Sequence, residues 1–240
     1  MADYELLRFS GAEELARAVA DAWLDEIEAA HRAGEAHCVA LSGGRIAQKF
    51  FTATVTRARA RQVSWDGVHF FWADERCVPP TDPESNYRIA AELLFAPLQI
   101  SAEKIHRIRG EDAPQVAAEE AEKKWRQISC KNPSAKPVMD LVFLGMGEDG
   151  HVASLFPPAP EKIVDKGVSF LAVENSPKPP PTRISMSYAA IIGAKKRWIL
   201  VSGAGKAQAL RDSLTGICKT PLGRVMAASP SKIFSDLNEF

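Results

Sequence analysis

The sequence predicts an α/β fold in which helices cover a mostly parallel sheet, and two observations carry this prediction. Short continuous apolar runs, typical of strands buried on both faces, alternate along the chain with stretches of helical periodicity. The 240 residues suit one large α/β domain, and the 46% hydrophobic content provides for a core. Since no repeat or low-complexity segment divides the chain, we expect a single domain over residues 1–240.

The first half of the chain alternates between helix and strand. Apolar side chains at helical spacing predict a helix that opens at Ser10 or Gly11 and runs toward Arg32. After it we expect a strand over 38–41, a helix over 46–61, a strand over 68–73, and a helix that is capped by Ser85 and ends at Phe95.

The second half continues the pattern, with proline-rich connections. An Ala/Glu-rich stretch predicts a helix over 113–128. Apolar runs predict strands over 140–144, 170–173, 183–188 and 198–201, and composition predicts loops over 131–137 and 177–181. Strands that alternate with helices in this way are typical of a parallel sheet.

Charge and cysteine usage exclude several classes of protein. The 30 basic and 30 acidic side chains give a formal net charge of +0, which argues against nucleic-acid and membrane surfaces. No run approaches the ~20 apolar residues that cross a bilayer, and the first ten residues do not resemble a secretory signal. We expect reduced thiols in a cytoplasmic protein without a metal site, because four cysteines are scattered without ligand spacing: Cys38, Cys77, Cys130 and Cys218.

Two glycine turns follow predicted strands, where ligands of parallel sheets bind. Ser42-Gly43-Gly44-Arg45 follows the first strand, and the 202–206 segment, which ends in Lys206, follows the last. Such turns bring backbone N–H groups and a helix N-terminus toward an anion, although a tight turn that binds nothing is the commoner reason for glycines at such a position.

Three consecutive charges, Asp74, Glu75 and Arg76, follow the 68–73 strand. Charges at the end of an apolar strand are costly to bury unless they are paired or bind a ligand, and a solvated loop is the alternative. A cluster of both signs suits a polar substrate, because the carboxylate of Asp74 accepts from sugar hydroxyls and the guanidinium of Arg76 donates to oxygens.

The loop after the 140–144 strand is the most informative segment. Three glycines there match the G-x-G-x-x-G dinucleotide pattern: Gly145, Gly147 and Gly150. The match fails physically, because prolines at 157, 158 and 160 would end the long helix that this pattern requires. We therefore interpret the glycines as shaping a loop that presents Asp149 and His151, a candidate general base, together.

The proline-rich segment 176–183 carries two further cations, Lys178 and Arg183. One interpretation is a PxxP ligand for a partner domain, and the other is a stiff loop that holds both cations toward the pocket. Together the strand ends predict a small, phosphorylated, polyhydroxylated substrate and base-assisted chemistry.

In the same order and over nearly the whole chain, these motifs resemble the 6-phosphogluconolactonase family. The matching segments are 41–44, 74–79 with 82–83 and 85–87, 144–151 with 153–157, 176–181 with Arg183, and 203–207. The resemblance implies a Rossmann-like three-layer α/β/α fold and hydrolysis of the δ-lactone of 6-phosphogluconate in the oxidative pentose phosphate pathway, without metal or organic cofactor. It implies a small phosphorylated sugar lactone as partner, and we expect a monomer.

The resemblance also implies roles for individual residues. His151 would activate water, Asp149 would orient it or bind hydroxyls, and Arg76 would stabilise substrate charge or the developing oxyanion. Glu148, in the same loop, is an alternative to Asp149. The phosphate and the polar edge of the substrate would be surrounded by Ser42, Gly43, Gly44, Lys178, Arg183 and Lys206.

One position departs from the family pattern, and three rival functions remain. A hydroxyl residue commonly follows the glycine pair in the family, whereas this chain has Arg45, which we expect to contact the phosphate directly.

The rivals are a glucosamine-6-phosphate isomerase (deaminase), a non-catalytic sugar-phosphate sensor and a dinucleotide-binding oxidoreductase. The isomerase family carries additional acidic residues after its histidine, where this chain has Ala153-Ser-Leu-Phe-Pro157.

Overall fold

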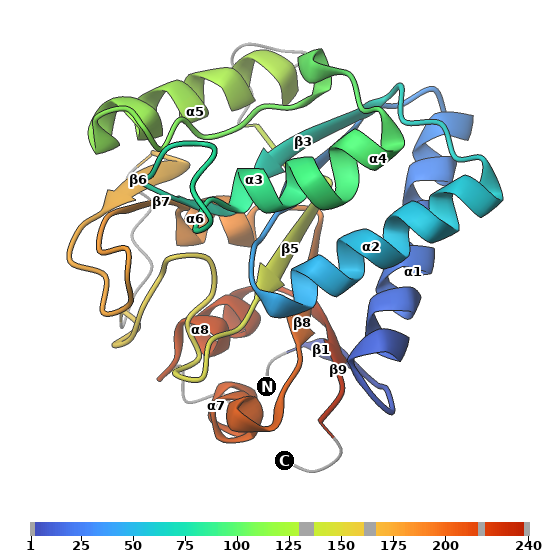
Figure 1. The fold of residues 1–240 in the computed structure, drawn as a ribbon. Helices are drawn as coiled ribbons and strands as arrows, with labels where there is room; N and C mark the ends of the chain where they lie inside the picture. The colour runs from blue at the N-terminus through green and yellow to red at the C-terminus, as the bar shows by residue number, and fades with distance from the viewer. Residues whose placement is uncertain (1–2, 130–136, 161–166, 216–218, 238–240) are drawn as a thin grey trace.

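A six-stranded parallel sheet forms the centre of the computed structural model, which describes residues 3–129, 137–160, 167–215 and 219–237 (Figure 1). The strand order is β1-β9-β8-β5-β2-β3, and every neighbouring pair is parallel. The strands are β1 (Tyr4–Arg8), β2 (His37–Leu41), β3 (Val68–Trp72), β5 (Leu141–Gly145), β8 (Lys196–Val201) and β9 (Ser231–Ser235). The predicted α/β class is confirmed.

Helices cover this sheet. In Figure 1, α1 and α2 lie together on one side, α5 lies at the top of the view, and α7 and α8 lie at the bottom. The α-helices are α1 (Ala12–Arg32), α2 (Arg45–Arg61), α3 (Asn86–Ala90), α4 (Ala96–Leu98), α5 (Pro114–Ser129), α6 (Tyr188–Ile192), α7 (Ala207–Leu214) and α8 (Pro221–Ala228). Three short helical turns complete the set: Ala91–Phe95, Ala102–Lys104 and Ala204–Lys206.

An aromatic cluster attaches α1 and α2 to the sheet. The fully buried ring of Trp23 on α1 lies 5.4 Å from Phe50 on α2, 5.2 Å from Phe143 on β5 and 6.3 Å from Phe70 on β3, measured between ring centroids. Such edge-on and tilted aromatic pairs bury large apolar areas with defined geometry. The cluster therefore fixes β3 and β5, whose carboxyl ends carry the site.

A second, antiparallel sheet corrects part of the sequence prediction. It consists of β4 (Asp74–Arg76), β7 (Arg183–Met186) and β6 (Phe170–Val173), in the order β4-β7-β6. The sequence predicts that residues 74–76 follow a strand, but they form a strand themselves. The chain leaves the central sheet after Ala73, whose N–H donates to Leu41 and whose carbonyl accepts from Met186, and then pairs with β7.

Several helices and strands of the structure differ from the sequence prediction in existence or in length. The sequence does not predict β1 and β9, nor the short helices α6 and α8, and it indicates α7 only as a helix that starts after the 202–206 turn. The predicted 183–188 strand ends at Met186, because Ser187 accepts from the N–H of Ala190 and starts α6. Cys38 and Cys77 are free thiols, whereas Cys130, Cys218 and most of the predicted 131–137 loop lie outside the described residues.

Candidate active site

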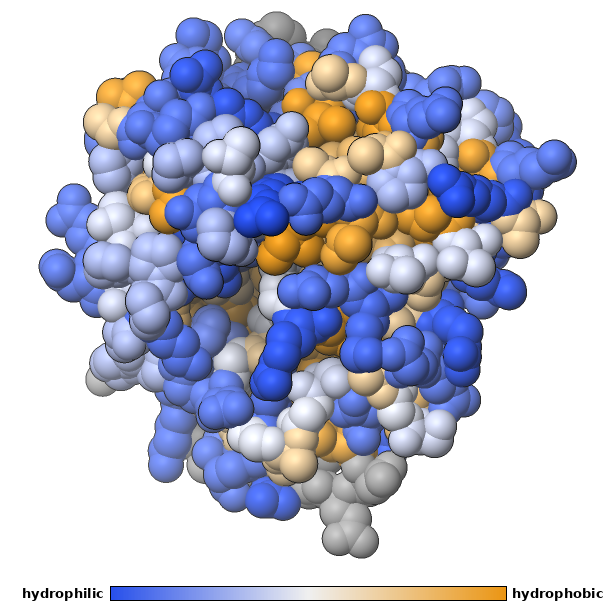
Figure 2. Space-filling model, viewed as in Figure 1, coloured by the Kyte–Doolittle hydropathy of each residue, from blue (hydrophilic) through white to orange (hydrophobic). Residues whose placement is uncertain are grey.

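A pocket opens at the carboxyl ends of β2 and β5, and nine of the eleven predicted site residues line it. In Figure 2 a hydrophobic band runs directly below α3, and mainly hydrophilic residues lie beneath it, around the place where β5 ends in Figure 1. The predicted residues in the lining are Ser42, Gly43, Gly44, Arg45, Asp74, Arg76, His151, Arg183 and Lys206. The rest of the lining includes Gly145 and Gly147, which the sequence indicates as shaping the loop, and four residues to which the sequence assigns no role: Ile46, Asn86, Met146 and Ala153.

The loop after β5 holds His151 against Asp149. Nδ1 of His151 lies 2.5 Å from Oδ1 of Asp149, which also accepts from the backbone N–H of His151 at 3.3 Å. The loop closes on itself, since Gly147 donates to the carbonyl of His151 and Gly150 donates to the carbonyl of Gly147. A Cβ at Gly147 would overlap the imidazole ring, so only glycine leaves room for the His–Asp pair.

Burial and hydrogen bonding set the protonation of this pair. Burial lowers the pKa of His151, and the hydrogen bond and charge of Asp149 oppose that shift without cancelling it. Burial alone would raise the pKa of Asp149, but the His151 hydrogen bond and the charges of His151 and Lys178 together lower it. A neutral imidazole that donates from Nδ1 to a carboxylate leaves Nε2 as a proton acceptor, which is the arrangement of a general base.

Glu148 is not the partner of His151, which answers the alternative left open by the sequence. Its carboxylate lies against the backbone of Gly205, where an added Cβ would be 3.0 Å from Oε1 of Glu148. Asp149 itself does not line the pocket and acts on it through His151.

Asp74 is buried at the pocket wall and is held by a serine. Its Oδ2 accepts from the hydroxyl of Ser154 at 2.7 Å, and the N–H of Ser154 donates to the hydroxyl of Ser185 at 3.1 Å. This network fixes the carboxylate of Asp74 beside His151, whose pKa it raises slightly. Ser154 lies in a segment that the sequence matched to the family without assigning it a function.

Alternation along β4 separates the roles of its three charges. Asp74 and Arg76 line the pocket, whereas Glu75 is buried on the other face at the start of α3. The carboxylate of Glu75 accepts from the N–H groups of Arg76, Asn86 and Tyr87 at 2.7–2.8 Å and from the hydroxyl of Ser85. Glu75 therefore ties β4 to α3, a role that the strand period would have indicated had residues 74–76 been recognised as a strand.

Arg76 and Arg183 approach the pocket from neighbouring strands, since they pair in the β4–β7 register. Nη1 of Arg76 donates to the carbonyl of Glu84 at 2.7 Å, and its buried Nε has no partner among the described residues. Arg183 is only 4% exposed, and burial, followed by the charge of Arg76, lowers its pKa. Two like charges that face one pocket favour an anionic or oxygen-rich ligand.

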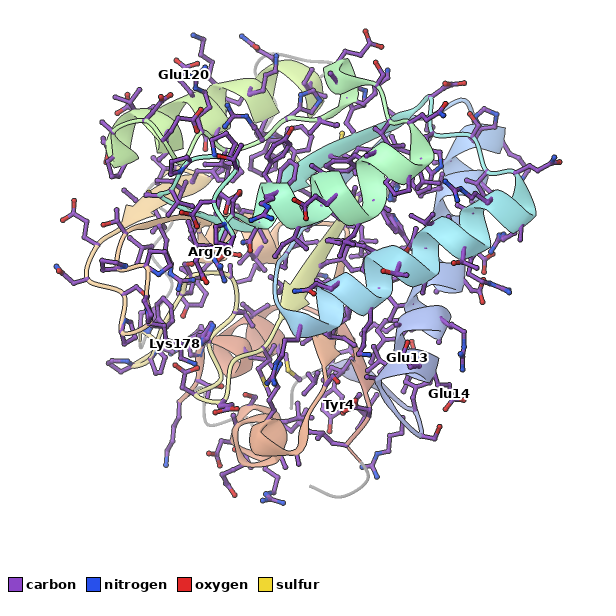
Figure 3. The ribbon with its side chains drawn as sticks, viewed as in Figure 1. Tyr4, Glu13, Glu14, Arg76, Glu120 and Lys178 are labelled. Atoms are coloured by element: carbon purple, nitrogen blue, oxygen red, sulfur yellow. The ribbon has the colours of Figure 1, made fainter. Side chains whose placement is uncertain are left out.

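The proline-rich loop is built around Arg183. The guanidinium donates to the carbonyls of Pro179 at 2.8 Å, Pro180 at 3.1 Å and Lys178 at 3.3 Å. Lys178 does not line the pocket, and its Nζ lies 3.9 Å from Oδ1 of Asp149 (Figure 3 labels Lys178 and Arg76). These contacts support a structured loop that holds Arg183 in the pocket.

Two cations border the glycine turn. Arg45 starts α2 directly after Gly44, which adopts a φ of 97° that favours glycine, and Lys206 ends the turn after β8. Neither makes an ion pair with a described residue, and burial, followed by the charge of Arg45, lowers the pKa of Lys206. The hydroxyl of Ser42 donates to the carbonyl of Phe143 at 2.8 Å, so Ser42 supports the turn and keeps only acceptor capacity.

Within the described ranges, no three His, Cys, Asp or Glu side chains converge as metal ligands. In that same part of the chain, no helix has the length and apolar character to cross a membrane.

Comparisons with known proteins identify the family of the chain. A family model described as glucosamine-6-phosphate isomerases/6-phosphogluconolactonase matches residues 10–234. A 6-phosphogluconolactonase of Haemophilus influenzae is 40% identical over 177 residues, which cover 74% of this chain and 73% of that protein. One of Treponema pallidum is 33% identical over 210 residues, or 87% and 83% of the two chains. The crystal structure of a 6-phosphogluconolactonase from Thermotoga maritima superposes with a TM-score of 0.80 at 25% identity and covers 98% of this chain and 99% of that one.

Proposed function

The chain belongs to the glucosamine-6-phosphate isomerase/6-phosphogluconolactonase family, and we propose that it hydrolyses 6-phospho-D-glucono-1,5-lactone to 6-phospho-D-gluconate in the pentose phosphate pathway. The observation that carries the proposal is the contact between Nδ1 of His151 and Oδ1 of Asp149, at a pocket that also contains arginines and a glycine turn. The named relatives support a lactonase within a family that contains two activities.

In this mechanism Nε2 of His151 takes a proton from water as the water oxygen attacks the lactone carbonyl carbon. The imidazolium that forms is stabilised by the carboxylate of Asp149 at Nδ1. Collapse of the tetrahedral intermediate breaks the bond to the ring oxygen, which receives the proton back and becomes the 5-hydroxyl. General-base catalysis contributes roughly 10²–10⁴-fold.

The pocket supplies the remaining functions. Arg76 and Arg183 are placed to donate to the carbonyl oxygen as it becomes negative, a contribution of roughly 10²–10³-fold for one such donor. Asp74 accepts from a sugar hydroxyl through the oxygen that Ser154 leaves free. The phosphate lies at the glycine turn, between Gly43, Gly44, Arg45 and Lys206. Lys178 is outside the lining of the pocket and lies beside Asp149.

The protein is further proposed to act as a cytoplasmic monomer, without metal, organic cofactor or nucleic acid. Lactones are reactive esters, so a positioned water, a base and oxyanion support suffice. The +0 net charge offers no overall attraction for nucleic acid. Sedimentation equilibrium tests the monomer, and turnover that persists after exhaustive chelation tests independence from metals.

The test of function is the hydrolysis of freshly generated lactone, coupled to oxidation of the 6-phosphogluconate formed. Spontaneous opening requires a blank without enzyme, and His151→Ala is the matched variant. We expect a large excess over the blank that collapses in the variant. No excess from the wild type would reject the lactonase, and ammonia released from glucosamine 6-phosphate would indicate the isomerase instead.

A further inference from the structure

Asn86, the first residue of α3, bridges β4 and the glycine turn after β2. Its backbone N–H donates to Oε1 of Glu75 at 2.8 Å, and its Nδ2 donates to the carbonyl of Asp74 at 2.9 Å. A carbonyl oxygen only accepts, so this bond assigns Nδ2 to the β4 side. The acceptor Oδ1 therefore faces away from Asp74.

Oδ1 of Asn86 lies against Gly43. A Cβ built at Gly43 would overlap Oδ1 and Cγ of Asn86, so the amide occupies the space that a side chain at position 43 would need. Asn86 is 2% exposed, and its Oδ1 is buried without a hydrogen-bond partner among the described residues. A buried acceptor without a partner costs about 1–3 kcal/mol. A smaller apolar side chain would avoid that cost, which points to a role for the amide beyond filling space.

We propose that Asn86 is a positioning residue that holds the Gly43–Gly44 turn in the backbone geometry that binds the substrate phosphate. The inference rests on the proposed function, since it assigns the phosphate to this turn. Glycine allows the backbone many conformations, and backbone N–H groups bind an anion only in a conformation in which they converge on it. Asn86 restricts Gly43 from the β4 side, and through Asp74 it keeps the phosphate end of the pocket in register with the catalytic end.

This role predicts a defect in binding rather than in chemistry. Asn86 does not touch His151 or Asp149, whose contacts come from the loop after β5. Loss of the amide should therefore raise KM for the phosphorylated lactone and change kcat little. The shape relationship adds a second prediction, because removing the amide makes room for the methyl group that it excludes at position 43.

The experiment is a double-variant cycle of Asn86→Ala, Gly43→Ala and the two combined, in the full-length protein. KM and kcat are measured with the lactone, and 6-phosphogluconate is titrated calorimetrically so that binding is measured without turnover. Ser85→Ala is the control, because it removes the N-cap of α3, one residue away, without touching the turn. Thermal unfolding of each variant separates loss of folding from loss of binding.

We expect Asn86→Ala to raise KM about five- to tenfold, with kcat within about twofold. Gly43→Ala should raise the dissociation constant for 6-phosphogluconate more than about tenfold. The combined variant should have a dissociation constant at least about fivefold lower than that of Gly43→Ala. Ser85→Ala should lower the melting temperature and leave KM unchanged. Additive effects in the cycle, or a fall in kcat at constant KM in Asn86→Ala, would overturn the role. A wild type that binds 6-phosphogluconate without turnover fails only the lactonase proposal, whereas one that does not bind it fails both.

Discussion

The phenyl ring of Phe156 lies against the imidazole of His151, with the ring centroids 4.7 Å apart and the planes tilted by 41°. The guanidinium carbon of Arg183 lies 5.7 Å from the centroid of the same phenyl ring. Phe156 therefore lies beside both the base and a buried cation, and its ring contributes to the burial that lowers the pKa of His151.

The first prediction concerns the pH dependence of catalysis. A base must be neutral to act, so kcat/KM should rise with pH through the pKa of His151, with a midpoint below the ordinary 6.5. Phe156→Ala admits water, weakens the desolvation and should move that midpoint up toward 6.5. Blank-corrected pH–rate profiles measure both values. A midpoint that does not differ between the two proteins would remove Phe156 from this role.

The second prediction separates two effects of Asp149. Asp149→Asn should lower the plateau of kcat by roughly 10²–10⁴-fold, since the imidazolium loses its stabilising carboxylate. Because the carboxylate raises the pKa of His151, its removal should also move the acidic midpoint further down. Lys178→Met is the opposite control, because the ammonium lowers that pKa and its loss should raise the midpoint. Midpoints that move in the same direction in both variants would contradict the assignment.

The third prediction tests the arginine that follows the glycine pair. If Arg45 contacts the phosphate, Arg45→Ser loses a charge-assisted hydrogen bond and should raise KM by about 10- to 100-fold at little cost in kcat. Glucono-1,5-lactone, which lacks the phosphate, should be hydrolysed equally well by both proteins. An unchanged KM for the phosphorylated lactone would show that Arg45 points to solvent and that backbone N–H groups suffice.

The fourth prediction compares two glycines of one loop. Gly147→Ala should lower kcat by more than about 100-fold, since the methyl group displaces the imidazole and Asp149 from each other. Gly145→Ala should be far milder, because its Cβ would make an ordinary 3.7 Å contact with the carbonyl of Gly43. Circular dichroism checks that both variants fold. Equal losses of activity would mean that the loop tolerates no side chain anywhere, rather than that position 147 is special.

The sequence predicts β2, β3, β5 and β8 of the central sheet and β6 and β7 of the second sheet, but it predicts neither β4 nor the pairing that makes a second sheet. Strands β2, β3, β5 and β8 each consist mainly of apolar residues, as expected for strands buried on both faces. Strand β4 is a run of three charges, which no strand pattern identifies. It is a strand because its partner β7 lies more than 100 residues later in the chain, and local sequence carries no information on such pairing.

The sequence likewise predicts some residues of the site and misses others. The residue types at the strand ends indicated the pocket, because the carboxyl ends of parallel strands meet at one edge. The sequence does not predict the role of Asn86, because that role depends on the space beside Gly43. It does not predict the role of Ser154 either, because its partner Asp74 is 80 residues away in sequence. Lys178 illustrates the converse, since a cation in a suitable motif lies beside Asp149 rather than in the lining.

The pairing of β1 with β9 has a consequence for synthesis on the ribosome. Tyr4 pairs with Ser231, so β1 meets the one strand that it pairs with in the described part of the chain only after about 230 further residues have been made. The same late segment carries Asp236, which accepts from the hydroxyl of Ser202 and the N–H of Gly203 and so anchors the turn that leads to Lys206. A nascent chain stalled before β9 would thus lack the contacts that anchor the Lys206 turn. Catalytic competence should therefore be among the last properties that the growing chain acquires.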